Sequence, residues 1–176
     1  MARKNRKKAL QLIGLILGVG LIITVIVIAV DKFSDRAIED PNALTIEWKK
    51  GDEDVVVKPY RVCDLFEQDA CTVTEANAAH IKLGLEETGE LNVGKEVGSG
   101  KWTVQRFFSD ESVNSESVKE PGEAMNETIA GSTSVNGERT PLGVVEVSTA
   151  VVGKNAAGEE TTYGITWSIV NDSAAM

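Results

Sequence analysis

The sequence predicts an all-β protein: an antiparallel β-sandwich, immunoglobulin-like, preceded by one N-terminal transmembrane helix. Three observations carry this prediction. A stretch of 22 residues without a charge begins at Ala9. Beyond it, short stretches alternate apolar and polar residues with the period of two that is typical of strands. Frequent turn signals separate these stretches, and no helical period of useful length occurs among them, which favours about seven short strands in a sandwich.

The uncharged stretch, Ala9 to Val30, is long enough to cross a membrane as a helix. At ~1.5 Å per residue it extends ~33 Å, and a hydrocarbon core is ~30 Å thick. Five basic residues precede it and acidic residues follow it, so the positive-inside rule places residues 1–8 in the cytoplasm and the rest of the chain outside. Gly14 and Gly18 form a small-xxx-small pair that could pack against another membrane helix.

A cleaved signal peptide is the alternative interpretation of this stretch. Its apolar region usually has about 7–15 residues and ends in a small-x-small cleavage site. The stretch is longer than that, and its best candidate site, Val27-Ile28-Ala29, is a mediocre match, so we predict an uncleaved anchor. The expected organisation is a cytoplasmic basic tail (1–8), a transmembrane anchor (9–30), a polar stalk (31–42) and an extracytoplasmic β-sandwich domain (43–176).

The charge distribution argues against a nucleic-acid partner. Five of the 18 basic residues and none of the 27 acidic residues precede Asp31, so the remainder of the chain carries a net charge of −14. An acidic body repels phosphate backbones, whereas nucleic-acid binding needs a basic surface. We therefore expect the partners to be the plasma membrane, through residues 9–30, and other membrane or envelope proteins.

The predicted strands begin directly after the stalk. The clearest are 141–153 and 161–170, which are joined by a polar, glycine-containing connection and predict a β-hairpin. Further stretches with strand character are 44–48, 54–63, 80–85 and 101–108. Residues 109–140 are rich in Ser, Glu, Asn and Gly, and we predict that they form longer loops.

Trp48, Trp102 and Trp167 are candidates for the core or, alternatively, for a partner surface. Trp167 is the best placed of them, because Ile165 and Ile169 share its face of the predicted strand. The other face of that strand carries small polar residues. This alternation predicts a half-buried strand with Trp167 in the core.

Cys63 and Cys71 are the only cysteines, and they raise the question of a metal site, a redox pair or a disulfide. If the body lies outside the cytoplasm, the simplest answer is one disulfide that closes a short loop. A redox pair would need the Cys-x-x-Cys spacing. A zinc site built on the cysteines and His80, the single histidine, lacks a fourth ligand unless an acid joins. We predict no cofactor and no metal, and we expect His80 to be a strand residue.

Other motifs predict no chemistry of their own. "GKEVGSGKW" (94–102) departs twice from the phosphate-binding loop pattern, and we interpret it as a glycine-rich hairpin turn before the Trp102 strand. The two members of an adjacent acid pair point to opposite faces of a strand, so they are poorly placed to bind one ion together. These pairs are Glu86-Glu87, Asp110-Glu111 and Glu159-Glu160. No Gly-x-Ser-x-Gly elbow of a serine hydrolase is present.

The order of motifs is similar to that of a known family. "VVVKPYRVC", "GKWTVQRFFSD", "RTPLGVVEVSTAVVG" and "GEETTYGITWSIV" follow a basic tail and an apolar segment. Together they resemble an uncharacterised actinobacterial cell-envelope family, domain of unknown function 2771. The resemblance implies a protein held at the outer face of the plasma membrane, and it implies no active site.

Two functions remain. The first is a membrane-anchored extracytoplasmic β-sandwich module that acts as a non-enzymatic accessory or binding subunit of a cell-envelope or membrane protein complex. The second is an envelope enzyme that acts on glycans or lipids through carboxylates alone. It would need two carboxylates ~5–10 Å apart.

Overall fold

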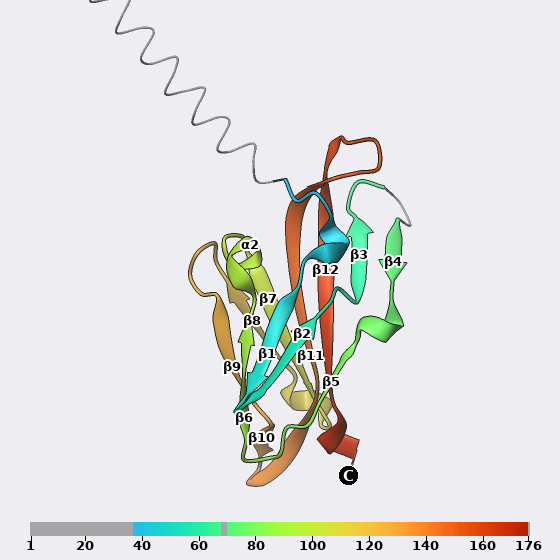
Figure 1. The fold of residues 1–176 in the computed structure, drawn as a ribbon. Coiled ribbons are helices and arrows are strands. Elements are labelled where there is room, and N and C mark those ends of the chain that lie inside the picture. The colour runs from blue at the N-terminus through green and yellow to red at the C-terminus, as the bar shows by residue number, and fades with distance from the viewer. Residues whose placement is uncertain (1–36, 68–69, 176) are drawn as a thin grey trace, which may run out of the picture. The chain divides into compact units, whose positions relative to one another are not determined.

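The computed structural model describes residues 37–67 and 70–175 (Figure 1). The predicted tail, the predicted anchor with Gly14 and Gly18, and most of the predicted stalk lie outside the described residues. Among the helices of the described residues, none is long and apolar enough to cross a membrane. The residues from Ile38 onward form one unit, which we call the body.

The body is all-β and consists of two sheets, as the sequence predicts. The smaller sheet has the order β2 (Glu53–Val57), β1 (Ile46–Lys50), β6 (Thr88–Asn92) and β9 (Asn126–Ala130). The larger sheet has the order β4 (Cys71–Val73), β3 (Arg61–Asp64), β12 (Glu160–Asn171), β11 (Glu138–Lys154), β7 (Trp102–Phe108) and β8 (Ser115–Lys119). β10 (Ser132–Val135) pairs with β11. β5 (Ala79–Ile81) pairs with β12 and is parallel to it, whereas the other strand pairs are antiparallel.

Short helical turns connect the strands. They are the 3-10 turns η1 (Pro41–Ala43), η2 (Glu75–Asn77), η3 (Glu111–Val113) and η4 (Asp172–Ala175), and the α-helical turn α2 (Gly94–Gly98). α2 corrects the predicted hairpin turn at 94–102. It links β6 of the smaller sheet to β7 of the larger one, so the chain changes sheets there instead of folding back along a neighbouring strand.

The predicted hairpin near the C-terminus is the longest feature of the larger sheet (Figure 1). β11 and β12 pair in a continuous antiparallel register from Val144–Val170 to Lys154–Glu160. β12 is covered on both of its faces, however, and is not the half-buried strand that the sequence predicts: Thr166 and Ser168 on its polar face are only 7% and 6% exposed. These short side chains lie beside longer ones, because Arg61 on β3 is the register partner of Thr166 and Glu146 on β11 is that of Ser168.

The three tryptophans lie in the core between the sheets, each at most 1% exposed. The indole nitrogens of Trp102 and Trp167 donate hydrogen bonds to the carbonyl oxygens of Ala124 and Leu44, at 3.1 Å each. Trp48 packs directly over Gly89, where a Cβ atom would lie 2.1 Å from its ring. Each tryptophan therefore buries a large apolar ring, and the two bonded indoles also have their polar group satisfied.

Residues 109–140 contain three strands where the sequence predicts loops. β8, β9 and β10 are composed mainly of polar residues, and in β9 Ile129 is the one buried side chain. β8 and β9 lie at sheet edges, where backbone hydrogen bonds to one neighbour suffice and most side chains face solvent. The residue composition therefore does not predict these strands, because backbone hydrogen bonds hold them and side-chain burial does not.

The predicted strand 80–85 ends early. β5 stops at Ile81, and Leu85 is 45% exposed. Beyond β5 the chain is held by the buried amide of Asn171. Its oxygen accepts from the Leu83 backbone N–H at 2.9 Å, and its nitrogen donates to the carbonyl oxygens of Leu83 and Leu142, both at 2.9 Å. The Asn171 side chain thus replaces the backbone hydrogen bonds of a neighbouring strand. The alternation of apolar and polar residues does not reveal this.

Candidate functional site

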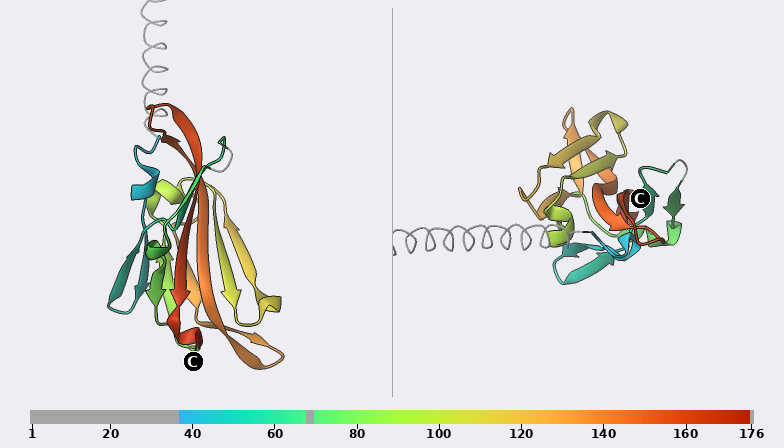
Figure 2. Two further views of the ribbon diagram at one scale, coloured as in Figure 1. Left: turned by 90° about the vertical axis from the view of Figure 1, so that its right-hand side faces the viewer. Right: turned by 90° about the horizontal axis from the view of Figure 1, so that it is seen from above.

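Three segments meet at the end of the body where the preceding chain joins it (Figures 1 and 2). We call this the attachment end, and it comprises residues 38–43, the described residues of the β3–β4 loop (65–67 and 70) and the tip of the β11–β12 hairpin. Ile38 forms an isolated parallel bridge with Gly153. Its N–H donates to the Val152 oxygen at 2.9 Å, and its own oxygen accepts from the Lys154 N–H at 3.1 Å. Ile38, expected in the stalk, is therefore bonded to the body, and Pro41 packs against Gly153.

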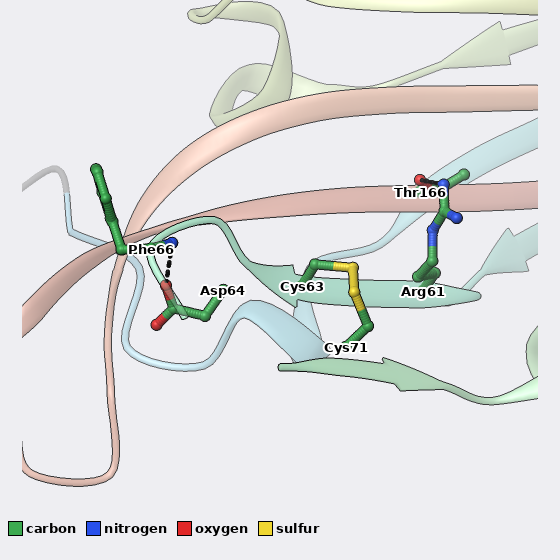
Figure 3. Close-up of a disulfide and its surroundings, with 6 residues drawn as sticks. All are labelled: Arg61, Cys63, Asp64, Phe66, Cys71 and Thr166. Atoms are coloured by element: carbon green, nitrogen blue, oxygen red, sulfur yellow. Dashed lines mark hydrogen bonds between the residues drawn. A yellow bond between two sulfur atoms is a disulfide. The ribbon is translucent and has the colours of Figure 1, made fainter. Parts of the chain in front are cut away.

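A disulfide closes the β3–β4 hairpin, as predicted (Figure 3). Cys63 and Cys71 are register partners in the antiparallel pair, and their sulfur atoms are 2.04 Å apart. On the loop side of this pair, the Asp64 N–H donates to the Ala70 oxygen at 2.9 Å. Both thiols are consumed by the bond, so neither is available as a metal ligand or as a free redox partner.

Asp64 shapes the loop that the disulfide closes. Its Oδ1 atom accepts from the Phe66 N–H at 2.9 Å (Figure 3). The same atom accepts from the Thr161 hydroxyl at 2.9 Å. The Leu65 N–H in turn donates to the Thr162 oxygen at 2.9 Å. These bonds fix the loop to β12 and leave two large apolar side chains outside: Leu65 is 56% exposed and Phe66 is 78% exposed.

A pocket of about 500 Å³ lies at the attachment end. It draws residues from all three segments: Asn42, Val62, Asp64, Glu67, Ala70, Cys71, Thr72, Asn155, Ala156, Ala157 and Tyr163. The disulfide, through Cys71, and the bridge at Gly153 therefore hold the walls of the pocket on β3, β4 and the long hairpin. Sequence reasoning missed it because its lining residues come from three separate segments that extend from Asn42 to Tyr163.

The lining gives this pocket an acidic character. Asp64 and Glu67 supply carboxylates, and Asn42 and Asn155 supply amides. Burial, together with the charges of Asp64 and Glu67, raises the pKa of Tyr163. Such a lining can accept a positively charged group, which the carboxylates would pair with, or a group that donates hydrogen bonds.

The other acidic candidates have structural contacts. Glu86 pairs with Arg139 at 2.7 Å and Glu87 with Lys50 at 3.0 Å, so the two members of that pair use different cations. Asp110 accepts from the Ser112 N–H at 2.9 Å and caps η3. Glu159 and Glu160 are exposed on the hairpin. Within residues 37–67 and 70–175, no group of three or more His, Cys, Asp or Glu side chains is arranged to hold a metal ion.

His80 lies at the opposite end of the body. It is part of β5, as predicted, and it is the register partner of Val170 near the end of β12. Its Nδ1 atom lies 2.8 Å from Oδ1 of Asp172, and both side chains are exposed. Val170 is eight residues from Thr162 along β12, or ~27 Å at the rise of a strand, so His80 cannot reach the pocket.

One charged cluster has no signal in the sequence. Glu127 on β9 bonds to Arg106 on β7, to Lys119 on β8 at 2.6 Å and to Ser117 on β8 at 3.1 Å. Burial by itself raises the pKa of Glu127, but the hydrogen bond from Lys119 and the charge of Arg106 outweigh it and lower the pKa below its ordinary value. The cluster joins β9, at an edge of the smaller sheet, to β7 and β8 of the larger sheet. It therefore stabilises the fold.

Comparison with known proteins gives a family and nothing finer. Neither a curated protein nor a solved structure matches the chain. One family, described as protein of unknown function (DUF2771), matches residues 39–172. The match begins one residue after the Ile38 bridge and ends within η4, and so it spans the two sheets, the disulfide and the pocket. The chain therefore belongs to this family of unknown function, DUF2771.

Proposed function

We propose that this protein is a membrane-anchored, extracytoplasmic module of the actinobacterial cell envelope: a non-enzymatic accessory subunit that binds a membrane or envelope protein. Residues 9–30 are its single-pass anchor in the plasma membrane, with the tail inside and the body outside. The uncharged stretch behind five basic residues supports this topology, and the disulfide supports an oxidising compartment. The immunoglobulin-like class of the sandwich is part of the same proposal.

The observation that carries the binding role is the coincidence of a pocket, an apolar loop and the site of chain attachment at one end of the body. Binding sites are commonly concave, and they combine apolar surface with a few placed polar groups. The pocket here has that composition, and rigid elements hold it, because its walls are a disulfide-closed hairpin and the tip of the longest hairpin.

The chemistry of the pocket suits a basic partner segment. Asp64 and Glu67 offer negative charge, and the exposed Glu159 and Glu160 lie on the adjacent hairpin. Lys or Arg side chains of a partner would form charge-assisted hydrogen bonds with these carboxylates. A membrane anchor raises the effective concentration of the body near any partner in the same membrane, so a modest intrinsic affinity suffices.

The second candidate function is the carboxylate-dependent envelope enzyme acting on glycans or lipids. One observation favours it: Asp64 and Glu67 line the same pocket. In such an enzyme one carboxyl group would act as acid and the other as base or nucleophile. Asp64 is already engaged by Phe66 and Thr161, however, and is better placed to shape the loop than to transfer a proton.

Substitutions at Glu67 separate the two functions in a deletion strain complemented with the full chain. For a pocket that binds a basic segment, Glu67→Gln should reduce complementation slightly and Glu67→Lys should abolish it, because only the second places a repelling charge. For a catalytic carboxylate, Glu67→Gln should be as damaging as Glu67→Lys. Glu53→Lys, exposed on β2, is the matched control for charge reversal.

Release from the membrane tests the anchored role. Replacing residues 1–30 with a cleavable signal should weaken complementation, since the body then dilutes away from its partner. His80→Ala should leave complementation intact. Full rescue by the released body, together with its loss on Glu67→Gln, would replace the accessory function with the enzymatic one.

A further inference from the structure

The β3–β4 loop presents two adjacent large apolar side chains to solvent. Phe66 is 78% exposed and Leu65 is 56% exposed, and no other neighbouring pair of large apolar residues within 37–67 and 70–175 is exposed to this degree. The ring of Phe66 points away from the disulfide (Figure 3). Exposed apolar residues that lie together commonly mark a contact with protein or membrane.

The loop is held in this arrangement. Oδ1 of Asp64 accepts from the Phe66 N–H, and the Leu65 N–H is bonded to the Thr162 oxygen, so the backbone N–H groups of the apolar pair are both held. The Cys63–Cys71 bond closes the base of the loop. Little conformational entropy remains to be lost when the two side chains enter an apolar environment, which favours binding by a preorganised loop.

The length of the chain between the predicted anchor and the body limits how far this loop can be from the membrane. The predicted anchor ends at Val30, and residues 31–37 precede the Ile38 bridge. Seven residues span at most ~25 Å when fully extended. With the proposed anchor, Ile38 lies within this distance of the end of the anchor, and the attachment end is the part of the body that contains Ile38.

From this juxtaposition we propose that Leu65 and Phe66 insert into the interfacial region of the membrane that holds the anchor, and that this contact fixes the orientation of the body. The inference rests on the proposed membrane-anchored function. Carboxylates at the same end, at Asp40, Glu67 and Glu160, set the lipid preference: anionic headgroups repel them, so insertion is favoured in zwitterionic membranes and in high salt.

Tryptophan fluorescence of the full chain in vesicles tests the proposal. The probe is Phe66→Trp in phosphatidylcholine vesicles whose acyl chains carry bromine, which quenches tryptophan only at short range. The three native tryptophans are buried in the core of the body and give an unquenched baseline. We expect the emission added by the Phe66→Trp substitution to be quenched, and the quenching to fall when phosphatidylglycerol is added at low salt.

Phe107→Trp is the matched control, since Phe107 is also an exposed phenylalanine. It is the register partner of Val144 on β11, eight residues and ~27 Å along that strand from Val152, which pairs with Thr162 beside Leu65. Its added emission should be unaffected by bromine. Equal quenching in both variants would overturn the proposal, because it would show contact without a preferred end.

Two further outcomes distinguish this inference from the proposed function. If the protein floats with the vesicles on a density gradient and the Phe66→Trp emission is unquenched, the anchor holds but the inference fails, and the apolar pair must contact a protein. If the protein does not float with the vesicles, the anchor itself is wrong and the inference fails with it.

Discussion

The two ends of the body differ in the surface that they present to solvent. At the far end, which comprises residues 80–87, 129–142 and 169–173, polar side chains bond to the protein itself: Asn171 bonds to four backbone groups, and Arg139 bonds to Glu86 and Ser132. At the attachment end, Asp64 and Glu67 line an open pocket, and two large apolar side chains face solvent. The far end therefore stabilises the fold, whereas the attachment end presents surface for binding.

The largest expected effect lies in the core beneath both ends. Truncating a buried tryptophan typically costs about 3–5 kcal/mol, so Trp167→Ala in the soluble body (residues 37–176) should unfold it or sharply lower its melting temperature. Thermal unfolding followed by circular dichroism measures this. Phe66→Ala is the control, and its melting temperature should be unchanged. A stable Trp167→Ala variant would mean that the two ends do not share one core.

Asn171→Ala tests the stabilising role assigned to the far end. The substitution leaves the Leu83 N–H and two carbonyl oxygens buried without a partner, and each such group costs about 1–3 kcal/mol. We expect a loss of about 2–4 kcal/mol in chemical denaturation. Asn171→Asp should lose nearly as much, because it removes the two donated bonds while keeping the size. Loss of the Phe66→Trp quenching in a still-folded Asn171→Ala variant would contradict the separation of the ends.

Removal of the disulfide should have a smaller effect on stability and a clear effect on the attachment end. By loop-entropy arguments, Cys63→Ser with Cys71→Ser should cost about 2–3 kcal/mol. Hydrogen exchange should rise in β3, β4 and the loop between them and stay unchanged at Leu83 and Asn171. Mass spectrometry of the unreduced protein checks that the bond is closed. Free alkylation of both thiols without reductant would remove this difference between the ends.

The smallest effect concerns Glu127 and depends on pH. Its pKa is lowered in the folded state, so the ionised carboxylate stabilises the fold above the unfolded pKa of about 4.3, and this contribution disappears as the pH falls through the folded value. Glu127→Gln should therefore cost about 1–2 kcal/mol at pH 7 and progressively less below pH 4. Glu90→Gln, at an exposed position on the adjacent β6, is the matched control for loss of a carboxylate.

Alternation and apolar burial made the central strands predictable. β11 carries buried residues at nearly every second position over a long stretch, β7 begins with the same alternation, and β12 has large apolar side chains at alternate positions, so the sequence locates all three. The sequence does not predict β8, β9 and β10, because backbone hydrogen bonds hold these strands and their exposed side chains show no alternation. The sequence does not predict the early end of β5 for a different reason. Asn171 lies 88 residues from Leu83, and no local sequence pattern links the two.

The candidate site likewise has one part that the sequence predicts and one part that it does not. The disulfide follows from two cysteines in a chain expected outside the cytoplasm, but the pocket needs residues from three distant segments. One signal was present in the sequence: "LF" at 65–66 is an apolar pair inside an otherwise polar and acidic loop between the two cysteines. A pair of this kind has no core to join when a disulfide closes so short a loop, and exposure is the consequence.

The bridge between Ile38 and Gly153 has a mechanical consequence. A pull on the chain ahead of Ile38 acts first on two backbone hydrogen bonds and on the packing of Pro41 against Gly153, before it reaches β1. Residues 38–43 can peel away under load and lengthen the link by up to ~20 Å before the load reaches Leu44, whose carbonyl oxygen accepts from the Trp167 indole in the core. The Ile38–Gly153 bridge would thus open under tension before the sheets do, and it would form again when the load is removed.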